Sequence, residues 1–292
     1  MKRRGRTRPM RRVRTVTALR RAIAAWRRAG LRIAFVPTMG AIHDGHLSLV
    51  RRARLSADRV VASVFVNPLQ FGPHEDYRRY PRPVRQDRAR LAGAGVDLLW
   101  EPQVADLYPP DDRTRVRVIG LDSVLEGASR PGHFEGVATV VVKLLGAVAP
   151  DELWLGQKDA QQARILEQAC RDLFLAVRVR RAPTLREPDG LALSSRNAYL
   201  GERERAAANA LPLGLAAAHA ALERGERSSA RLKRAVRQVW RGHPLVREDY
   251  VAVVDSDSLV PVARVRRRVL VAVAARVGRA RLIDNFEWEP RS

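Results

Sequence analysis

Cysteine is almost absent from this sequence of 292 residues. Cys170 is the single cysteine, so an internal disulfide bond is excluded, and its helical surroundings predict a buried thiol instead of a nucleophile. The basic start of the chain, residues 1–14, lacks the apolar stretch of roughly 7 to 15 residues that a secretory signal needs. Both absences favour a reducing, cytoplasmic location.

Long hydrophobic runs are absent as well, although 46% of the residues are hydrophobic. The most apolar stretch, Val137–Val148, is interrupted by Lys143 and falls short of the roughly 18 consecutive apolar residues of a membrane span. We therefore expect no association with a membrane. The length exceeds that of a typical single domain, which predicts one large domain and a smaller one.

Lysine is scarce: Lys2, Lys143, Lys158 and Lys233 are the only lysines among 54 basic residues, and the formal net charge is +23. Such a charge can indicate nucleic-acid binding. Here the arginines are scattered over every predicted helix, and the few aromatic residues, 5% of the chain, are not interleaved with them for base stacking. We therefore expect solvated arginine faces and no nucleic-acid partner. Residues 1–13 form a basic tail that we expect to be disordered.

Short apolar runs alternate with amphipathic patterns over most of the chain. Ile33–Val36 is a continuous apolar run typical of a parallel sheet covered on both faces, and Pro37 ends it. A helix from Leu19 that ends at Gly30 precedes this run. The pattern continues with helices over 47–55, 84–92 and 137–147 and strands over 60–66, 96–100 and 153–155.

This alternation indicates an α/β fold, a Rossmann-like doubly wound parallel sheet over 14–184, with its ligand at the carboxyl ends of the strands. Helices over 202–222 and 229–240, then strands over 250–254 and 269–275, indicate a smaller C-terminal α+β domain over 185–292. We expect this second domain to act as a lid.

The first chemical motif follows the strand at 33–36 and opens a helix. Gly40 and Gly45 let a phosphate approach the backbone, and the helix start favours negative charge. His43 and His46 are three residues apart and can meet the same phosphate. A zinc pair or a helix cap are the alternatives, but a third metal ligand at a suitable spacing is not evident.

This His-x-Gly-His pattern resembles the signature of the nucleotidyltransferase and class I aminoacyl-tRNA synthetase superfamily, which implies cleavage of ATP between its α and β phosphates. That superfamily has a second, basic loop after the last core strand, and Leu193–Asn197 matches its position. Two hydroxyls and the Arg196 guanidinium can hold the triphosphate, whereas the alternative reading of Ser194 and Ser195 is a helix cap.

Six segments together narrow the resemblance to one family. In chain order, the segments that resemble the pantothenate synthetase family are Val36–Gly40, His43–His46, Phe65–Phe71, Leu125–Phe134, Gly156–Asp159 and Asp189–Asn197. The likeness spans about residues 14 to 288 and includes Ala280–Asn285. It implies ATP-dependent condensation of pantoate with beta-alanine to give pantothenate, AMP and diphosphate through a bound pantoyl adenylate, with Mg²⁺ required.

The same resemblance assigns roles to residues at the matching positions. It implies His46, His43 and Lys158 as catalytic residues, with His46 as proton donor and Lys158 near the α phosphate. The implied ATP-binding residues are Met39, Gly40, Ala41, Ile42, His43, Asp44, Gly45, His46, Gly156, Gln157, Lys158, Asp159, Leu185, Leu193, Ser194, Ser195 and Arg196. Gln70, Gln162, Asn67 and Arg130 are implied to bind pantoate and beta-alanine, although Asn67 can also orient its loop and Arg130 can form a structural salt bridge.

Three positions depart from the family pattern: Gln157 replaces a usual Glu, Ala160 a bulky residue and Glu135 a basic one. We expect altered loop packing instead of lost activity from Gln157, and modestly weaker substrate binding from Glu135. The resemblance also implies a homodimer. Two other classes stay open on sequence alone, namely a relative that transfers a nucleotidyl group without forming an amide and a basic nucleic-acid-binding protein.

Overall fold

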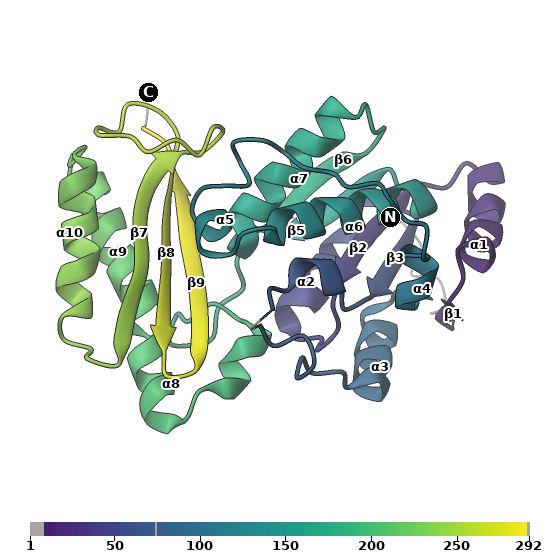
Figure 1. Ribbon diagram of the computed structural model, residues 1–292, viewed down its shortest axis with the longest axis horizontal. Helices are drawn as coiled ribbons and strands as arrows, with labels where there is room; N and C mark the ends of the chain where they lie inside the picture. Colours follow the sequence, from purple (N-terminus) through teal and green to yellow (C-terminus); the bar gives the residue numbers. More distant parts are fainter. Residues whose placement is uncertain (1–8, 74, 291–292) are drawn as a thin grey trace. The chain divides into compact units, whose positions relative to one another are not determined.

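The computed structural model describes residues 9–73 and 75–290, which fold into two compact units (Figure 1). The first unit comprises residues up to Ser123, Gly127–Gly156 and Gln162–Ala182. The second comprises Val124–Glu126, Gln157–Gln161 and the chain from Pro183 onward. The sequence predicts a single boundary after residue 184, whereas the structure also groups two short internal segments with the C-terminal part.

The first unit is built on a parallel sheet of six strands in the order β1-β4-β3-β2-β5-β6. The strands are β1 (Arg11–Val13), β2 (Ile33–Thr38), β3 (Arg59–Val64), β4 (Leu98–Trp100), β5 (Glu152–Gly156) and β6 (Arg178–Ala182). The helices are α1 (Val16–Arg28), α2 (Asp44–Ser56), α3 (Val84–Ala94), α4 (Val104–Leu107), α5 (Glu126–Ser129, which begins in the second unit), α6 (His133–Val148) and α7 (Ala160–Asp172). The predicted doubly wound parallel sheet is confirmed.

The strand order places the topological switch point between β2 and β5. From β2 the chain runs through α2 to β3 and through α3 to β4 in one direction, while β5, α7 and β6 extend the sheet in the other. In open α/β sheets, ligands bind beyond the carboxyl ends of the strands at such a point. The segments that follow β2 and β5 are the ones that carry His43, His46 and Lys158.

Side chains of β2 are buried on both faces of the sheet. Ala34 and Val36 pack with residues of α2 and α3 in one hydrophobic cluster. Ile33 and Phe35, also fully buried, point to the opposite face because strand side chains alternate. The continuous apolar run therefore corresponds to a strand inside the sheet, as predicted. Cys170, in α7, is buried, which was also predicted.

The disordered tail predicted for residues 1–13 includes residues that are ordered in the structure. Arg11–Val13 form β1, which pairs with β4 so that Val13 lies opposite Trp100. Val13 is buried, and the indole nitrogen of Trp100 donates to the carbonyl of Arg14 at 2.7 Å. Val13 is the one buried residue of this edge strand, so β1 gives no periodic signal in the sequence. Residues 1–8 of the predicted tail lie outside the described residues.

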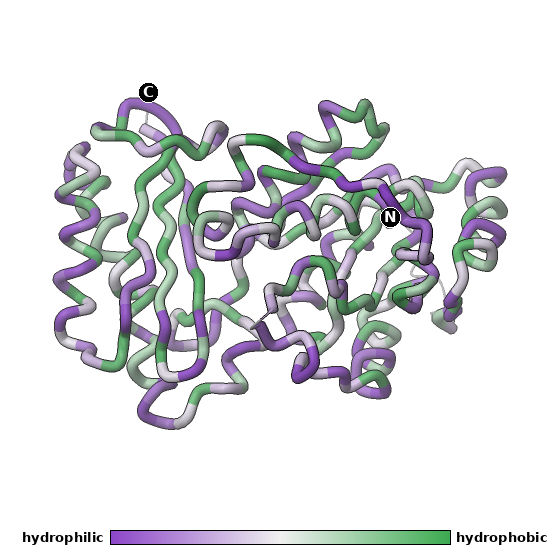
Figure 2. Tube along the Cα trace, in the orientation of Figure 1, coloured by the Kyte–Doolittle hydropathy of each residue, from purple (hydrophilic) through white to green (hydrophobic). Residues whose placement is uncertain are grey.

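The second unit contains an antiparallel sheet of β7 (Val246–Asp255), β8 (Val269–Val277) and β9 (Ala280–Trp288). α8 (Glu202–Ala208), α9 (Ala210–Glu223) and α10 (Ser229–Trp240) accompany it, and residues of α9 and α10 share one hydrophobic core with β8. In Figure 2 the strand β8 is mostly hydrophobic, as its burial requires. The α+β character predicted for this part is confirmed.

Two details of this unit differ from the prediction. The single helix expected over 202–222 is broken at Asn209, because the ring of Pro212 is incompatible with a continuous helix through the carbonyl of Ala208. β9 is a strand that the sequence pattern does not predict. Within residues 9–73 and 75–290, no helix combines the length and apolar character needed to cross a membrane.

Candidate active site

The loop after β2 depends on a glycine at position 40. Gly40 has φ of 86°, and a Cβ there would lie 2.9 Å from an oxygen of Asp87 and 3.1 Å from Val64. Only glycine adopts this backbone conformation readily and leaves that space. The next residue, Ala41, has φ of 50°, so the turn that leads into His43 is tightly specified.

Asp87 in α3 holds this loop, a role that the sequence did not reveal. Its carboxylate accepts from the N–H groups of Ala41 at 3.0 Å and Ile42 at 2.7 Å, and Arg90 donates to the carbonyl of Ile42 at 2.8 Å. Asp87 is 2% exposed, and burial raises its pKa although these N–H groups and Arg90 oppose the rise. The N–H groups of Ala41 and Ile42, two of the implied ATP-binding residues, thus donate to this carboxylate.

His43 and His46 lie against each other at the start of α2, with ring centroids 4.0 Å apart. His43 is the N-cap residue, and its Nδ1 accepts from the N–H of Gly45 at 3.1 Å. The Nδ1 of His46 accepts in turn from the N–H of His43 at 3.4 Å. The helix-cap interpretation is therefore correct, and contact of either histidine with a phosphate stays a prediction.

These contacts define the proton positions on both rings. A nitrogen that accepts a backbone N–H carries no proton, so each neutral imidazole has its proton on Nε2. Both histidines therefore present the same kind of donor. The N-terminus of α2 adds a favourable field for an anion at this position.

Gln70 lies in the short 3-10 helix η1 (Pro68–Gln70), and its side chain is oriented through Asn67. Asn67 is 1% exposed; its Nδ2 donates to the Gly136 carbonyl at 3.0 Å and to Oε1 of Gln70 at 3.1 Å. Its Oδ1 accepts from Tyr108 at 2.8 Å and from the Leu69 N–H at 3.3 Å. Asn67 thus orients η1, and substrate binding by Asn67 stays a prediction.

Backbone packing fixes η1 as well. A Cβ on Gly136 in α6 would lie 2.3 Å from the Leu69 carbonyl oxygen and 2.7 Å from the Gln70 nitrogen. Only glycine allows α6 to approach η1 this closely. Position 136 therefore controls the placement of Gln70.

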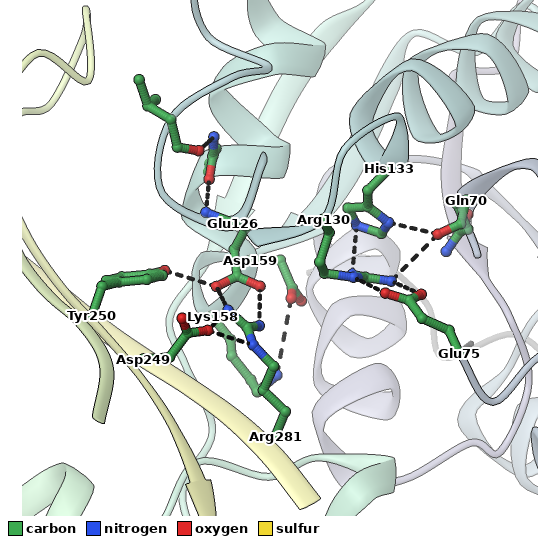
Figure 3. Close-up of polar contacts among 12 residues, drawn as sticks. Gln70, Glu75, Glu126, Arg130, His133, Lys158, Asp159, Asp249, Tyr250 and Arg281 are labelled. Carbon is green, nitrogen blue, oxygen red and sulfur yellow. Dashed lines mark hydrogen bonds and ion pairs between the residues drawn. The ribbon is translucent and has the colours of Figure 1, made fainter. Parts of the chain in front are cut away.

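Arg130 forms the structural salt bridge that the sequence left open. Figure 3 shows its guanidinium between Glu75, His133 and the backbone of Gln70. Two bonds of 2.6 Å join Arg130 to Glu75, and a third contact of 2.9 Å joins it to Nε2 of His133. His133 and Glu75 were not among the predicted site residues, and direct substrate binding by Arg130 stays a prediction.

In the second unit, Lys158 lies in η2 (Gln157–Asp159), which Asn285 of β9 supports. Asn285 donates from Nδ2 to the carbonyls of Gln157 at 3.1 Å and Lys158 at 2.8 Å. The ammonium of Lys158 is 3.9 Å from Asp159 (Figure 3). Asn285 belongs to a segment that contributed to the family resemblance, but the sequence assigned it no contact.

Asp284, next to Asn285, contacts the segment around Leu185, another residue implied to bind ATP. It is 2% exposed and accepts from Arg186 at 2.6 and 3.0 Å. Leu185 accepts the N–H of Leu193 at 3.0 Å through its carbonyl. Asn285 thus holds Gln157 and Lys158, and Asp284 holds Arg186, the neighbour of Leu185.

Ser194 is the N-cap of η3 (Ser195–Tyr199), and its hydroxyl accepts from the N–H of Arg196 at 3.2 Å. The predicted cap is therefore present at this motif too. Ser195 and Arg196 are half-buried within η3. Binding of phosphate by these side chains stays a prediction.

A partly buried ion-pair cluster explains why Val124–Glu126 group with the second unit. Glu126 accepts from Arg281 at 2.9 Å and from the hydroxyl of Tyr250 at 2.8 Å, and Arg281 also binds Asp249 at 2.6 Å (Figure 3). Burial raises the pKa of Tyr250, and the Glu126 carboxylate adds to the rise. Gln161 then accepts the Glu126 N–H at 3.0 Å and donates to the Val124 carbonyl at 2.7 Å.

The structure therefore gathers the predicted residues in two sets. Met39–His46, Asn67, Gln70, Arg130, Gly156 and Gln162 belong to the first unit, and Gln157–Asp159, Leu185 and Leu193–Arg196 belong to the second. Gln162 is half-buried in α7. Among the described residues, no three or more His, Cys, Asp or Glu side chains form a group that could hold a metal ion.

The chain is similar to proteins of known activity along nearly its whole length. The model of the family described as Pantoate-beta-alanine ligase matches residues 11–287. Pantothenate synthetase of Moorella thermoacetica is 49% identical over 94% of this chain and 97% of that protein. Pantothenate synthetase of Thioalkalivibrio sulfidiphilus is 53% identical over 95% of this chain and 97% of that protein.

Solved structures agree with these relatives. Pantothenate synthetase from Thermus thermophilus superposes with a TM-score of 0.90 at 47% identity, covering 96% of this chain and 100% of that one. Pantoate-beta-alanine ligase from Francisella tularensis, in complex with beta-gamma ATP and beta-alanine, gives a TM-score of 0.77 at 33% identity, covering 95% and 97%.

Proposed function

We propose a two-step adenylate mechanism for this chain, which belongs to the pantoate–beta-alanine ligase family. The chain is an enzyme of pantothenate biosynthesis that joins pantoate to beta-alanine in an ATP-dependent reaction. The proposal concerns the intermediate and the residues that form it. The observation that carries it is the pair of adjacent histidine rings at the N-terminus of α2, each with an Nδ1 that accepts a backbone N–H.

The chemistry requires activation of a poor acyl donor. In the first step a pantoate carboxylate oxygen forms a bond to the α phosphorus of ATP, and the bond to the bridging oxygen breaks, releasing diphosphate. In the second step the amine of beta-alanine attacks the carboxyl carbon of the adenylate, AMP leaves with the former carboxylate oxygen, and the amine loses a proton. The protein contributes positioning and charge stabilisation.

His46 and His43 act on the phosphates in this proposal. A neutral imidazole with its proton on Nε2 donates a hydrogen bond to the departing diphosphate without giving up the proton. In this proposal His46, for which the resemblance implies a role as proton donor, acts as a hydrogen-bond donor that keeps its proton. Lys158 neutralises charge near the α phosphate, because a compact ammonium suits a developing phosphate charge.

The remaining ATP contacts are assigned by resemblance. Met39, Gly40, Asp44, Gly45, Gly156, Gln157, Asp159, Leu185, Leu193, Ser194, Ser195 and Arg196 are proposed to bind ATP, and Ala41 and Ile42 to do so through atoms other than their N–H groups. The complex of the Francisella relative with beta-gamma ATP and beta-alanine supports a site for both molecules in this family.

Pantoate is proposed to bind Gln70 and Gln162, with Gln70 also close to beta-alanine. Neutral amides suit a substrate with hydroxyls and a carboxylate, because a carboxylate side chain would repel it. Asn67 and Arg130 are proposed to assist, although their observed contacts within the protein favour supporting roles.

Mg²⁺ is proposed to enter as a complex with ATP. Mg²⁺ commonly binds substrate phosphates and keeps several waters instead of using an all-protein cage. Homodimerisation and a cytoplasmic location are proposed from the family resemblance and from the single cysteine.

The mechanism is tested by exchange of labelled diphosphate into ATP. Pantoate alone, without beta-alanine, should support this exchange, and addition of beta-alanine should give equal amounts of AMP and pantothenate. Pantothenate formation without any exchange would contradict a reversible adenylate step.

His46→Ala separates the two possible roles of this histidine. We expect the exchange rate to fall roughly 100-fold or more while the Kd for ATP changes little, because the contact matters in the transition state. An equal loss in both quantities would instead mean that His46 binds ground-state ATP.

A further inference from the structure

We propose that Arg130, His133 and Glu75 form a positioning unit that fixes the backbone of Gln70 and so aims its side-chain amide at pantoate. The inference rests on the proposed role of Gln70 in pantoate binding. It assigns functions to His133 and Glu75, and it makes Arg130 a positioning residue instead of a substrate ligand. All four residues belong to the first unit.

The hydrogen bonds of His133 determine its protonation state. A guanidinium can only donate, so Nε2 of His133 accepts from Arg130 at 2.9 Å. A carbonyl can only accept, so Nδ1 of His133 carries the proton and donates to Gln70 at 2.8 Å. His133 is therefore a neutral relay that transmits the position of Arg130 to the backbone of Gln70.

Arg130 is fixed by four hydrogen bonds from its guanidinium. Its Nε and Nη2 each lie 2.6 Å from the carboxylate of Glu75, and Nη2 is 3.3 Å from the Gln70 carbonyl. Its side chain is 16% exposed, so the guanidinium is largely removed from water. A planar group with this many partners is a rigid support, and each partner uses a donor that a substrate would otherwise need.

Glu75 supplies the negative charge that neutralises the largely buried guanidinium of Arg130. Burial alone would raise the pKa of Glu75, but the hydrogen bonds and charge of Arg130 outweigh burial and lower it. The pair is therefore ionised and internally neutralised. Pantoate is then bound beside a neutral amide instead of a free arginine, which favours a defined geometry over simple charge attraction.

Two further contacts, outside the positioning unit, orient the amide at the end of the Gln70 side chain. Asn67 donates to Oε1 of Gln70, so the amide nitrogen of Gln70 must point the other way, toward the sulfur of Met39 at 2.9 Å. Sulfur is a weak acceptor. A substrate oxygen can replace it with a gain in hydrogen-bond strength, and Gln70 thus presents a preset donor to a hydroxyl or carboxylate oxygen.

Two substitutions at His133 separate its two hydrogen bonds. In His133→Asn the side-chain nitrogen can occupy the place of Nδ1 and still donate to the Gln70 carbonyl. In His133→Gln the amide reaches the place of Nε2, so it can accept from Arg130 but cannot donate to Gln70. His133→Ala removes both bonds.

The full-length enzyme should be assayed for KM toward pantoate and toward ATP, and for diphosphate exchange. We expect His133→Gln and His133→Ala to raise the KM for pantoate roughly tenfold or more, with the KM for ATP within about twofold of the wild type. His133→Asn should stay within about threefold of the wild type for both substrates. A purely structural role of His133 would move both KM values, or the melting temperature, together.

Arg130→Lys provides a second test if a His133 variant does not fold. A lysine keeps the charge against Glu75 but cannot contact Glu75, His133 and Gln70 at once, so the KM for pantoate should again rise while that for ATP holds. Unchanged pantoate KM in folded His133→Gln and Arg130→Lys would overturn the positioning unit, as would His133→Asn that is as impaired as His133→Ala.

Gln70→Ala distinguishes failure of the inference from failure of the proposed function. If Gln70→Ala raises the KM for pantoate and His133→Gln does not, only the positioning unit is wrong. If Gln70→Ala itself leaves the KM for pantoate unchanged, the proposed role of Gln70 is wrong, and the inference fails with it.

Discussion

Asp87 supports the loop between β2 and His43, although burial makes its own carboxyl group harder to ionise. Burial raises its pKa, which means that the folded protein disfavours the charged form relative to the unfolded chain. For a carboxyl with a raised pKa, the contribution to stability is greatest below the unfolded value and declines as pH rises through the folded value. At neutral pH the ionisation of Asp87 therefore does not stabilise the fold, and its main effect is on the geometry of the loop.

Asp87→Ala should accordingly impair catalysis more than folding. The buried N–H groups of Ala41 and Ile42 lose their acceptor, which costs about 1–3 kcal/mol, but relief of the buried carboxylate offsets part of this. We expect the diphosphate exchange rate to fall roughly tenfold or more, because His43 follows this loop directly. The melting temperature and the exchange rate should be measured together.

Gln86→Ala is the matched control, because Gln86 is an exposed neighbour on the same helix. It should leave both quantities unchanged. If Asp87→Ala unfolds the protein, or keeps the full exchange rate, the carboxylate does not have the role described.

At the scale of elements, β9 supports η2, the short helix that contains Lys158, through one residue. Asn285 donates to two successive carbonyls there, of Gln157 and Lys158, and it is 6% exposed. The backbone of Lys158 is thus held by a strand more than a hundred residues later in the chain. This clamp fixes the backbone from which the Lys158 side chain extends.

Asn285→Asp should therefore be more harmful than Asn285→Ala. The aspartate has nearly the same shape, but its carboxylate would face two carbonyl oxygens and repel them, whereas alanine leaves these oxygens without a donor. We expect Asn285→Asp to lower the exchange rate roughly tenfold or more and to raise the KM for ATP, with the KM for pantoate little changed. Equal effects of the two substitutions would argue against electrostatic displacement of η2.

The elements that could be predicted from sequence are those with strong local patterns. α10 has the bounds that the sequence predicts, 229–240, because Leu232, Val236 and Trp240 recur at helical spacing on its buried face. β1 and β6 escape prediction, because β1 has one buried residue and β6 is rich in arginine. β9 mixes apolar with charged residues, and its pairing with β8 decides its structure.

The site divides in the same way. His43 and His46 are close in sequence and follow a recognisable strand, so their pairing could be predicted. Asp87, His133 and Asn285 contact residues that are tens to more than a hundred positions away, and each looks like an ordinary polar residue locally. Only the folded chain brings them to the loops they support.

At the scale of the whole molecule, acid stability should depend on a buried carboxylate at the start of β5 in the parallel sheet. Glu152 begins β5, is 1% exposed and is contacted by Ser56, Trp154, Arg32 and Arg180. Burial by itself would raise the pKa of Glu152, but the hydrogen bonds from Ser56 and Trp154 and the charges of Arg180 and Arg32 outweigh it and lower the pKa. Glu152 therefore ionises more readily in the folded chain than in the unfolded one.

The sign of the effect follows from this direction. A carboxyl whose pKa is lowered by folding contributes stability above its unfolded value, about 4.5, and loses that contribution as pH falls through the folded value. Glu152→Gln cannot titrate, so its free energy of unfolding should fall less steeply than that of the wild type as pH is lowered from about 5 toward 3. At neutral pH the variant should be less stable by about 1–2 kcal/mol, a modest figure because both arginines are partly exposed and their attraction is screened. Urea unfolding at several pH values gives the free energy of unfolding of both proteins at neutral pH and its decrease toward acid pH. If the two free energies fall equally steeply between about pH 5 and 3, Glu152 does not govern the loss of stability in acid.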